Sequence, residues 1–444
     1  MKHRFLPFAF GLLWLTGPVW GQKNSLPPLD ALVDKEYPSL AELYLTLHRN
    51  PELSYMEVKT AQRMAQELKS AGFEVHEGIG GLGVLGILRN GPGKTILVRA
   101  DMDGLPVKEE TGLPYASTVV TKDSEGKDMP AMHACGHDIH MSTFVGTARL
   151  LGQLKSTWRG TVLMVAQSAE EKVGGATQMM NAGIYEKFGR PDVCVSLHAS
   201  AALAAGRVGY CPEYALANVN SIDITVYGEG GHGAYPHLTK DPVVLSANII
   251  TQLQTIVSRE VPALEAAVIT IGSIHGGNKH NIIPSEVKLQ LTLRTYTETI
   301  RQQCIESIKR ICRGAGIAAG LPDSKLPKVE VGNESAEALY NDPLLTAQVA
   351  ASLKRSLGGA QVDQVQPVMV SEDFGIFGRR ARPEVPVCMY WLGTVDPAKL
   401  AESAATGKRL PTLHSGDYYP LYEPSIRAGV KTMTGVVLDL LAGK

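Results

Sequence analysis

The sequence predicts an α/β protein with a mostly parallel sheet and a smaller, ferredoxin-like domain inserted into it. A chain of 444 residues is longer than one hydrophobic core normally serves, so two domains are expected. Short β-branched apolar runs alternate with helical patterns, which is typical of parallel α/β sheets. In the middle of the chain this alternation gives way to the order β-α-β-β-α-β.

The composition is that of a globular protein with small-molecule partners. Hydrophobic residues make up 44% of the chain, charged residues 20%, and the formal net charge is -1. The sequence therefore lacks the basic field that attracts nucleic acid or anionic lipid. We expect neither nucleic acid nor membrane as a partner, and the sequence leaves a homo-oligomer open.

The first 21 residues have the pattern of a secretory signal peptide. Basic residues at 2–4 precede an apolar run over 5–16 and a small-residue cleavage site before Gln22. The run is too short to span a membrane stably. We therefore expect 1–21 to be removed, and the mature protein to be exported to the periplasm or secreted.

The six cysteines are scattered along the chain and are too few to hold a protein of this size together by disulfides. We expect most of them to be buried thiols. Cys304 and Cys312 are eight residues apart on one predicted helix. That spacing separates them by about 12 Å and argues against a direct bridge.

The segment 22–215 is expected to form the first part of the larger domain. Two amphipathic helical patterns run from Pro38 to Ala71, and four apolar runs then predict strands over 84–88, 95–99, 161–166 and 193–197. The carboxyl edge of parallel strands is where open α/β sheets hold their ligands. Polar groups follow three of the strands there: Asp101 and Asp103 after the second, Glu170 and Glu171 after the third, and His198 after the fourth.

The segment 216–334 is predicted to be the inserted domain, which we call the lid, a domain of the kind that can also serve dimerisation. Its strands are expected over 221–227, 267–274, 286–296 and 328–332, and its helices over 242–259 and 298–315. About 115 residues suffice for a small domain. The segment 335–444 then completes the larger domain with a helix over 344–356, a strand over 385–392 and a helix over 425–441.

The run from His133 to His140 contains a high density of metal-binding side chains. Cys135 and His137 are the borderline-soft donors that zinc and its first-row neighbours take, and Gly136 frees the backbone to aim both side chains at one point. A buried cysteine beside a helix start is the alternative. A zincin helix motif is disfavoured, because Ala134 stands where that motif needs a glutamate.

The adjacent carboxylates of Glu170 and Glu171 could add a metal ligand and a base to Cys135 and His137. Two carboxylates at a strand end repel each other unless they share a cation or a proton, so the pair suggests one metal ligand and one acid/base group. A solvated loop is the alternative for an isolated pair. Their position at the predicted ligand-binding edge favours the functional interpretation.

Six ordered motifs together resemble a known family. They are Arg99–Pro106, Met132–His140, Ala169–Glu171, Gly230–His237, Ser371–Phe374 and Leu413–Ser415. The family is the aminoacylase and carboxypeptidase class of co-catalytic metallohydrolases. Within it, the chain is most similar to bacterial hippurate hydrolases, N-acyl-amino-acid amidohydrolases and plant indoleacetyl-amino-acid hydrolases. The resemblance covers nearly all of the chain after the signal peptide.

The resemblance implies an α/β di-metal hydrolase domain with two divalent ions, and a role for each motif. The ions would be held by Cys135, His137, Glu171, His198 and His414. Zinc is favoured by the thiolate, with manganese or cobalt as alternatives. Cys135 stands where other relatives place a bridging aspartate. Glu170 would be the general base toward metal-activated water, and Asp103 the supporting carboxylate. Asp101 is not assigned as a ligand, since other branches have a histidine there.

The resemblance also assigns roles within the lid. His232 would reach over the cleft on domain closure and polarise the scissile carbonyl, although a lone histidine after glycines is usually a surface turn. Asn281 and Arg294 would hold the substrate carboxylate, with an exposed strand residue as the alternative for Arg294. Ser168 and Gly104 depart from the group, which commonly has Pro and Ala there. Neither departure removes a reacting group.

We therefore expect an exported, metal-dependent amidohydrolase that cleaves N-acyl amino acids of the hippurate type. An exported dipeptidase or carboxypeptidase with the same centre is the second hypothesis. The third is an inactive protein that binds acyl-amino acids. The third is disfavoured because the chain keeps all the ligands and the base. The sequence leaves open which acyl group and amino acid are preferred.

Overall fold

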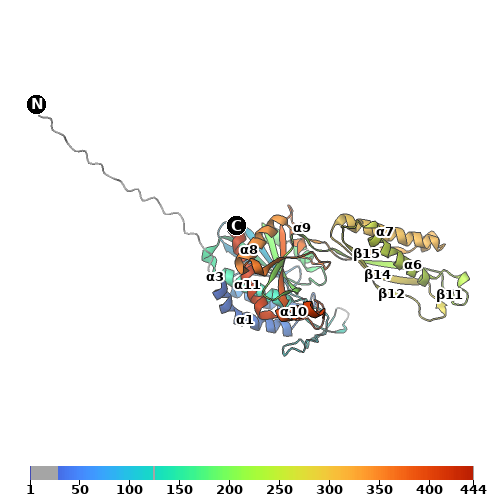
Figure 1. Ribbon diagram of the computed structural model, residues 1–444, viewed down its shortest axis with the longest axis horizontal. Helices are drawn as coiled ribbons and strands as arrows, with labels where there is room; N and C mark the ends of the chain where they lie inside the picture. Colours follow the sequence, from blue (N-terminus) through green and yellow to red (C-terminus); the bar gives the residue numbers. More distant parts are fainter. Residues whose placement is uncertain (2–28, 124–125, 444) are drawn as a thin grey trace.

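The computed structural model describes Met1 and residues 29–123 and 126–443, and its largest element is an eight-stranded mixed sheet (Figure 1). The strand order is β1-β2-β6-β3-β7-β18-β8-β17. The bounds in that order are Glu74–Ile79, Gly83–Asn90, Gly160–Gln167, Thr95–Asp101, Val193–Ala204, Val387–Val395, Val208–Tyr210 and Val362–Gln364. Apart from Met1, the predicted signal peptide lies outside the described residues.

The centre of this sheet is parallel, as predicted, and its flanks are not. β6, β3, β7 and β18 run in one direction, whereas β1 and β2 pair antiparallel and β2 pairs antiparallel with β6. The sheet is thus largely parallel, as expected, and the strand over 84–88 is among its antiparallel members. Only residues 91–94 separate β2 from β3, which is too short for the crossover that parallel strands require.

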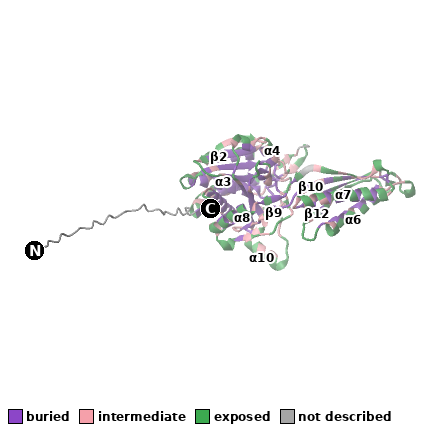
Figure 2. Cartoon of the chain, turned by 90° about the horizontal axis from the view of Figure 1, so that it is seen from above, coloured by how far each residue is buried: buried purple, intermediate pink, exposed green. Residues whose placement is uncertain are grey.

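Helices cover both faces of the large sheet, which explains why its strands are continuously apolar. On one face lie α1 (Leu29–Arg49), α2 (Val58–Ser70), α3 (His137–Gln153), α8 (Pro343–Leu357) and α11 (Tyr422–Leu441). On the other lie α4 (Gly175–Asn181), α5 (Ile184–Phe188) and α9 (Gly375–Arg379). Side chains alternate between the faces: Ile96 and Val98 enter the first core, and Leu97 the second. Figure 2 shows these strands as the most buried part of the chain.

The lid contains a four-stranded antiparallel sheet in the order β12-β14-β10-β15. The bounds are Ala267–His275, Glu286–Thr295, Val219–Tyr227 and Lys328–Ala336, with helices α6 (Pro242–Thr255, continued by a π turn to Glu260) and α7 (Glu298–Ala318). The element order is the predicted β-α-β-β-α-β. One face of the sheet forms a separate core with the two helices. The lid projects from the larger domain, with β11 (Gly231–His232) and β13 (Ile282–Ile283) paired at its far end (Figure 1).

Smaller elements complete the fold. β9 (Glu213–Leu216) pairs with β16 (Leu339–Asn341), β4 (Val120–Lys122) pairs with β5 (Asp128–Pro130), and α10 covers Pro397–Thr406. All six cysteines are free and buried, as predicted. Within the described ranges, no helix has the length and hydropathy to cross a membrane.

Candidate metal centre and active site

Six predicted site residues line one cavity of about 340 Å³. They are Cys135, Glu170, Glu171, His198 and His414 of the larger domain and Arg294 of the lid. β6 ends just before the glutamates, and His198 lies within β7, on the other side of β3. His198 is therefore inside a strand and does not follow one, because β7 continues to Ala204. Cys135 comes from the loop before α3, and His414 from the loop before α11. The predicted convergence at the carboxyl edge is therefore present in the structure.

The donor atoms lie at the separations expected of ligands that share an ion. Cys135 Sγ is 3.6 Å from His198 Nε2 and 3.3 Å from His414 Nε2. Glu171 Oε1 is 3.5 Å from His414 Nε2 and 3.8 Å from His137 Nε2. Ligands bound tetrahedrally at zinc distances would be about 3.3–3.8 Å apart. The donors thus divide between two overlapping groups joined through Cys135 and Glu171.

Two of the three imidazoles are oriented by a hydrogen bond from their other nitrogen. His137 Nδ1 donates to the carbonyl of Asp103 at 2.8 Å, and His198 Nδ1 donates to the carbonyl of Ala199 at 2.8 Å. Both Nε2 atoms therefore keep a free lone pair, which is the usual preparation of a histidine ligand. His198 lines the cavity, whereas His137 lies behind its wall, with Nε2 3.8 Å from Glu171 Oε1. Among the described residues, His137 Nε2 and Glu171 Oε1 are buried without a hydrogen-bond partner. Buried polar atoms normally have partners, so these two fit an ion-binding role.

The backbone takes unusual conformations to aim these side chains. Gly136, just before α3, has a φ of 81°, and a Cβ there would lie 2.9 Å from the side chain of Ala199. Glycine is therefore required between Cys135 and His137. Ala169 and His414 have φ values of 51° and 67°. Such conformations are rare for residues other than glycine, and they commonly occur where a site fixes the chain.

The electrostatics of the site favour a bound cation. Burial, followed by the nearby Glu171 and Glu170, raises the pKa of the Cys135 thiol well above its usual value. Burial also raises the pKa of Glu171 to about 7, and burial together with Glu372 raises that of Glu170 well above normal. Burial alone would lower the pKa of His137, but Asp101 and Asp103 outweigh it and raise the pKa to about 10. Divalent cations would stabilise these crowded anionic groups.

The donor set of one thiolate, three imidazoles and one carboxylate therefore fits metal ions of the zinc type. Bound there, such ions would lower the pKa of a water molecule and polarise a carbonyl group. Asp101 is 3.7 Å from His137 Nε2 but bonds Arg99 Nη1 at 2.6 Å and His140 Nδ1 at 2.5 Å. Asp101, His137 and His140 also form a group with ligand-type atoms close together, so leaving Asp101 off the ligand set stays a prediction.

Sequence reasoning missed the role of Arg99 as the centre of a buried ionic network. Its guanidinium contacts three carboxylates, those of Asp101, Glu372 and Asp373, at 2.6 to 3.1 Å. Gln167 adds a hydrogen bond to Arg99 Nε. Glu372 and Asp373 have ligand-type atoms close to Glu170. An arginine within an apolar strand was the available signal, since buried arginine is rare unless it is paired.

The three predicted lid residues lie in two separate places. Arg294, near the end of β14, lines the cavity and donates to the carbonyl of Met369 at 2.8 Å and to Ser371 Oγ at 3.2 Å. His232 and Asn281 are exposed at the β11–β13 end of the lid and do not line the cavity. The ten residues of β14 span about 30 Å, so these two residues are far from Arg294.

Apolar side chains form much of the cavity wall. Trp391 on β18 packs edge-on against His198, with ring centroids 5.5 Å apart. The other apolar residues that line the cavity are Val173, Leu216, Val219, Val370 and Leu413. A cavity with one lining arginine and an apolar wall suits a ligand that has one anionic group and an apolar remainder.

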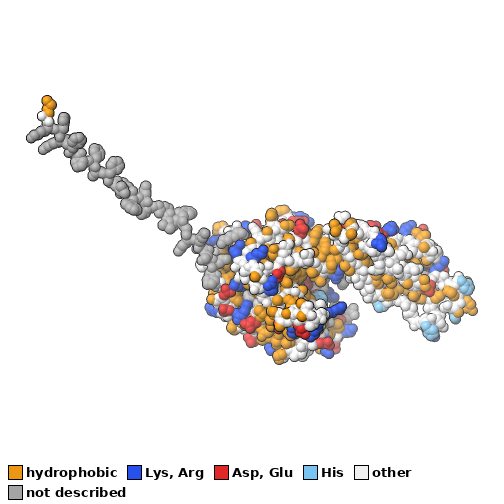
Figure 3. Space-filling model, viewed as in Figure 1, with side chains coloured by type: hydrophobic (Ala, Val, Ile, Leu, Met, Phe, Trp, Pro, Cys, Tyr) orange, Lys and Arg blue, Asp and Glu red, His pale blue; other side chains and the backbone are white. Residues whose placement is uncertain are grey.

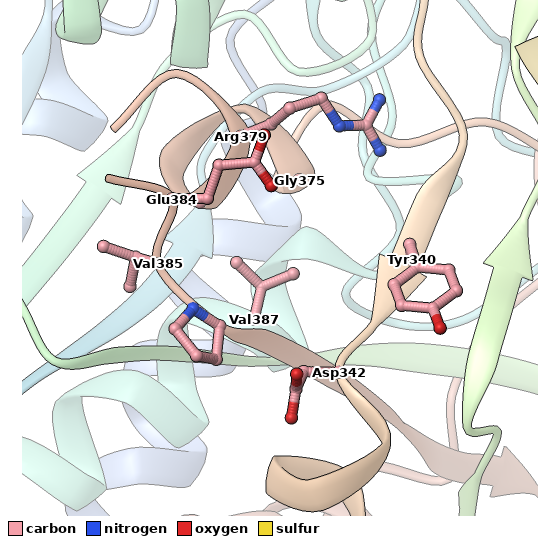
Figure 4. Close-up of a pocket in the computed structure, with 9 residues that line it drawn as sticks. Tyr340, Asp342, Gly375, Arg379, Glu384, Val385 and Val387 are labelled. Atoms are coloured by element: carbon pink, nitrogen blue, oxygen red, sulfur yellow. The ribbon is translucent and has the colours of Figure 1, made fainter. Parts of the chain in front are cut away.

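A second cavity, of about 310 Å³, lies beside α9 and the start of β18 (Figure 4). Its charged lining residues are Asp342, Arg379 and Glu384. Arg379 pairs with Glu337 and with the carbonyl of Ala338, and Asp342 caps α8 through Leu345 N. Of the residues that the structure describes, no cysteine or histidine lines this cavity. It therefore lacks the donors of the first cavity and is not a competing candidate.

Comparisons with known proteins agree with this geometry. Residues 97–408 match Peptidase family M20/M25/M40. An N-acetyldiaminopimelate deacetylase of a Geobacillus strain is 35% identical over 81% of the chain and 90% of its own length. Thermostable carboxypeptidase 2 of Saccharolobus solfataricus is 34% identical over 80% and 85%. The hippurate hydrolase of Campylobacter jejuni is 36% identical over 74% and 82%.

Solved structures share the fold. A protein of methicillin-resistant Staphylococcus aureus is 30% identical, with a TM-score of 0.79 over 93% of this chain and 99% of its own. A dinuclear metal-binding peptidase of Bacillus subtilis is 24% identical, with a TM-score of 0.73 over 92% and 99%. The α/β domain with its inserted lid is therefore the architecture of known proteins.

Proposed function

Since the chain belongs to Peptidase family M20/M25/M40 and is a metal-dependent amide hydrolase, we propose that it cleaves the amide bond of N-acyl amino acids. The observation that carries this proposal is that Arg294 and an apolar wall line the same cavity as four of the five proposed donors. A guanidinium that lacks a carboxylate partner among the described residues suits the free carboxylate of the product amino acid. The apolar wall suits an acyl group such as the benzoyl group of hippurate.

The same lining favours this substrate class over a doubly charged one. The relative from Geobacillus is, by its name, a deacetylase of N-acetyldiaminopimelate. A second charged end on a substrate would have to be buried against Trp391 or Leu216, which have no charge to offer. N-acyl amino acids with apolar acyl groups are therefore the preferred substrates in our proposal.

In this proposal Glu170 is the general base. Its carboxylate lies beside the donors, with Oε2 4.0 Å from His137 Nε2, and it accepts a proton from the attacking water. The same carboxyl then returns the proton to the leaving amine nitrogen as the amide bond breaks. The Asp103 carboxylate acts through His137, with its Oδ1 3.4 Å from His137 Nδ1. Two divalent ions, with zinc as the favoured metal, would supply the activation of water and of the scissile carbonyl.

Replacing Glu170 with Gln tests the assignment. The change preserves shape and removes the base, so turnover should fall by about 10²- to 10⁴-fold while substrate binding remains. Turnover of N-benzoyl amino acids would be measured with the ion content of both proteins matched. Turnover equal to that of the parent would refute the role of Glu170. Binding without turnover in the parent protein itself would instead indicate an inactive binding protein.

A dipeptidase or carboxypeptidase activity is the second candidate, favoured by the carboxypeptidase relative. Both activities require a free carboxylate beside the scissile bond, so Arg294 serves either one. Comparing N-acyl amino acids with dipeptides of the same terminal residue separates them. Faster cleavage of the dipeptides would favour the second candidate.

We also propose that the protein is exported, on the basis of the basic, apolar and small-residue pattern over 1–21. Sequencing the amino terminus of the protein from culture fractions tests this. A start near Gln22 in the periplasm or medium is expected. A start at Met1 or Lys2 in exported material would contradict it.

A further inference from the structure

Glu57 is a fully buried carboxylate that the proposed reaction does not use. It stands at the start of α2, where a capping side chain would normally bond the first backbone amides of the helix, but it makes no such bond. Glu52 bonds those amides instead, accepting from Lys59 N at 3.2 Å and from Thr60 N at 2.8 Å. Hydrogen-bond capping of α2 therefore does not require a carboxylate at position 57.

The side chain of Glu57 points to the catalytic turn. Its Oε1 accepts a hydrogen bond from the backbone amide of Ala169 at 2.7 Å, and within the described ranges its Oε2 has no partner. Ala169 has a φ of 51° and directly precedes Glu170 and Glu171. Burying a carboxylate costs free energy, so its retention beside a strained backbone calls for a compensating role.

A second carboxylate holds the same turn two residues later. Asp103 Oδ2 accepts from the backbone amide of Glu171 at 3.0 Å. Asp103 is in turn bonded by Ser54 Oγ at 2.7 Å, from the same loop as Glu57. The loop over 51–57 thus supplies Glu57 and also contacts Asp103, the two carboxylates that bond the backbone of the turn. It is also tied to the end of β3, because the carbonyl of Glu52 accepts from Gly104 N at 2.7 Å.

We propose that Glu57 is a positioning residue that holds the Ala169 amide and so sets the directions of the general base Glu170 and the metal ligand Glu171. This inference rests on the proposed roles of those two glutamates. Removing the hydrogen bond frees Ala169 to leave its positive φ, which turns both following side chains. A displacement of about 1 Å in a catalytic group can reduce turnover about 100-fold, and loss of a residue supporting a ligand typically costs about 10- to 100-fold.

The test compares four variants of the full chain. Glu57→Leu removes the acceptor, and we expect kcat to fall about 10- to 100-fold with KM within about twofold and with weaker ion binding. Glu57→Gln keeps an acceptor of the same reach and should recover most of the turnover. Glu52→Ala is the matched control, since it removes the α2 cap without touching Ala169. It should lower the melting temperature and leave kcat unchanged.

Each outcome decides the proposal. A parental kcat in Glu57→Leu would overturn it, as would an equal fall of kcat in Glu52→Ala, while the parent protein's activity would still support the proposed function. If Glu57→Leu does not fold, the fourth variant, Glu57→Asp, replaces it, because its carboxylate is one methylene too short to reach Ala169. The proposal then expects higher turnover and ion affinity in Glu57→Gln than in Glu57→Asp. The reverse order would overturn it.

Discussion

Most described histidines of the larger domain and those of the lid lie in opposite environments. His48, His133, His137, His140 and His198 are buried, whereas His76 is half-buried and the proposed ligand His414 is exposed. His232, His237, His275 and His280 of the lid are all exposed, and Figure 3 shows histidine side chains gathered at the far end of the lid. Four of the five buried rings are bonded by carboxylates or backbone carbonyls, the exception being His133, whose ring nitrogens lack a hydrogen-bond partner among the described residues. The larger domain therefore holds its ligand and base residues in place without the lid. The lid histidines lie outside the cavity, so they could reach a substrate only if the lid moved or a second copy of the chain supplied them.

The substitution expected to have the largest effect on the metal centre of the larger domain is His137→Ala. The change removes an imidazole placed between the carboxylates of Asp103 and Glu171 and leaves them without its stabilisation. We expect activity at background and loss of bound ions, measured as metal ions per chain alongside turnover. The exposed lid histidine offers a matched control, because His275→Ala should change neither quantity. Full ion content in His137→Ala would contradict its assignment as a ligand.

The next test concerns how His232 reaches a substrate. Arg294 is held at the cavity by Met369 and Ser371, and His232 is about 30 Å away at the other end of the lid's sheet. One rigid lid cannot bring both to the same cavity. We therefore expect His232 to act on the cavity of a second copy of the chain, and His232→Ala to lose about 10²- to 10³-fold in kcat, as loss of an oxyanion donor does.

Mixing two inactive variants measures this directly. Mixed dimers of Glu170→Gln with His232→Ala contain one complete site if His232 acts across copies. After unfolding and refolding together, up to roughly a quarter of the parental activity should return, since half of randomly formed dimers are mixed. Activity that stays at the level of the separate variants would show that His232 acts within its own chain or not at all.

Arg294 is the lid residue predicted to bind substrate that lines the cavity of the larger domain. Its replacement should reduce activity less than that of His137 or His232. Loss of a hydrogen-bonded charge partner costs about 1.5–3 kcal/mol, so Arg294→Ala should raise KM for N-acyl amino acids roughly 10- to 100-fold. Arg294→Lys should recover part of this, because lysine lacks the bidentate geometry. The comparison substrate is the corresponding amino-acid amide, which lacks the carboxylate. An equal rise in KM for that amide would contradict carboxylate binding.

The sequence predicted the larger domain better than the arrangement of the lid, for physical reasons. Strand ends and the fixed spacing of Cys135 and His137 are local features, and local features are enough to predict donors at one edge of a parallel sheet. The position of His232 depends on how a whole domain is oriented, which local patterns do not encode. The direction of β2 depends on a connection of only four residues, 91–94, whereas its apolar composition is the same as that of the parallel strands.

Glu57 and Arg99 were not predicted, because their roles depend on contacts with residues that are distant in the sequence. Glu57 has the sequence appearance of an acidic residue in a first helical turn, which is common and stabilising in itself. Only the fold shows that its carboxylate bonds Ala169 instead. Arg99 was within a recognised motif, but its partners Glu372 and Asp373 are more than 270 residues away along the chain.

The smallest expected effect is a pH-dependent loss of stability, which should occur on replacing a buried histidine of the larger domain but not an exposed one of the lid. His48 donates from Nδ1 to Asp138 at 2.7 Å and from Nε2 to Glu109 at 3.1 Å. Burial lowers its pKa, but the bonds to Asp138 and Glu109 outweigh burial and raise the pKa to about 9. The folded value is above the unfolded one of about 6.5, so this stabilisation is complete below about pH 6.5 and is lost as the pH rises through about 9.

His48→Gln should therefore reduce the free energy of unfolding by on the order of 1–3 kcal/mol at about pH 6, and by progressively less toward about pH 9 and above. Denaturant unfolding of both proteins at several pH values measures the difference. His275→Gln in the lid serves as the control and should show no such trend, because that side chain is exposed. A difference between His48→Gln and the parent that grows as the pH rises would contradict the charged state assigned to His48 and, with it, the contrast between the two regions.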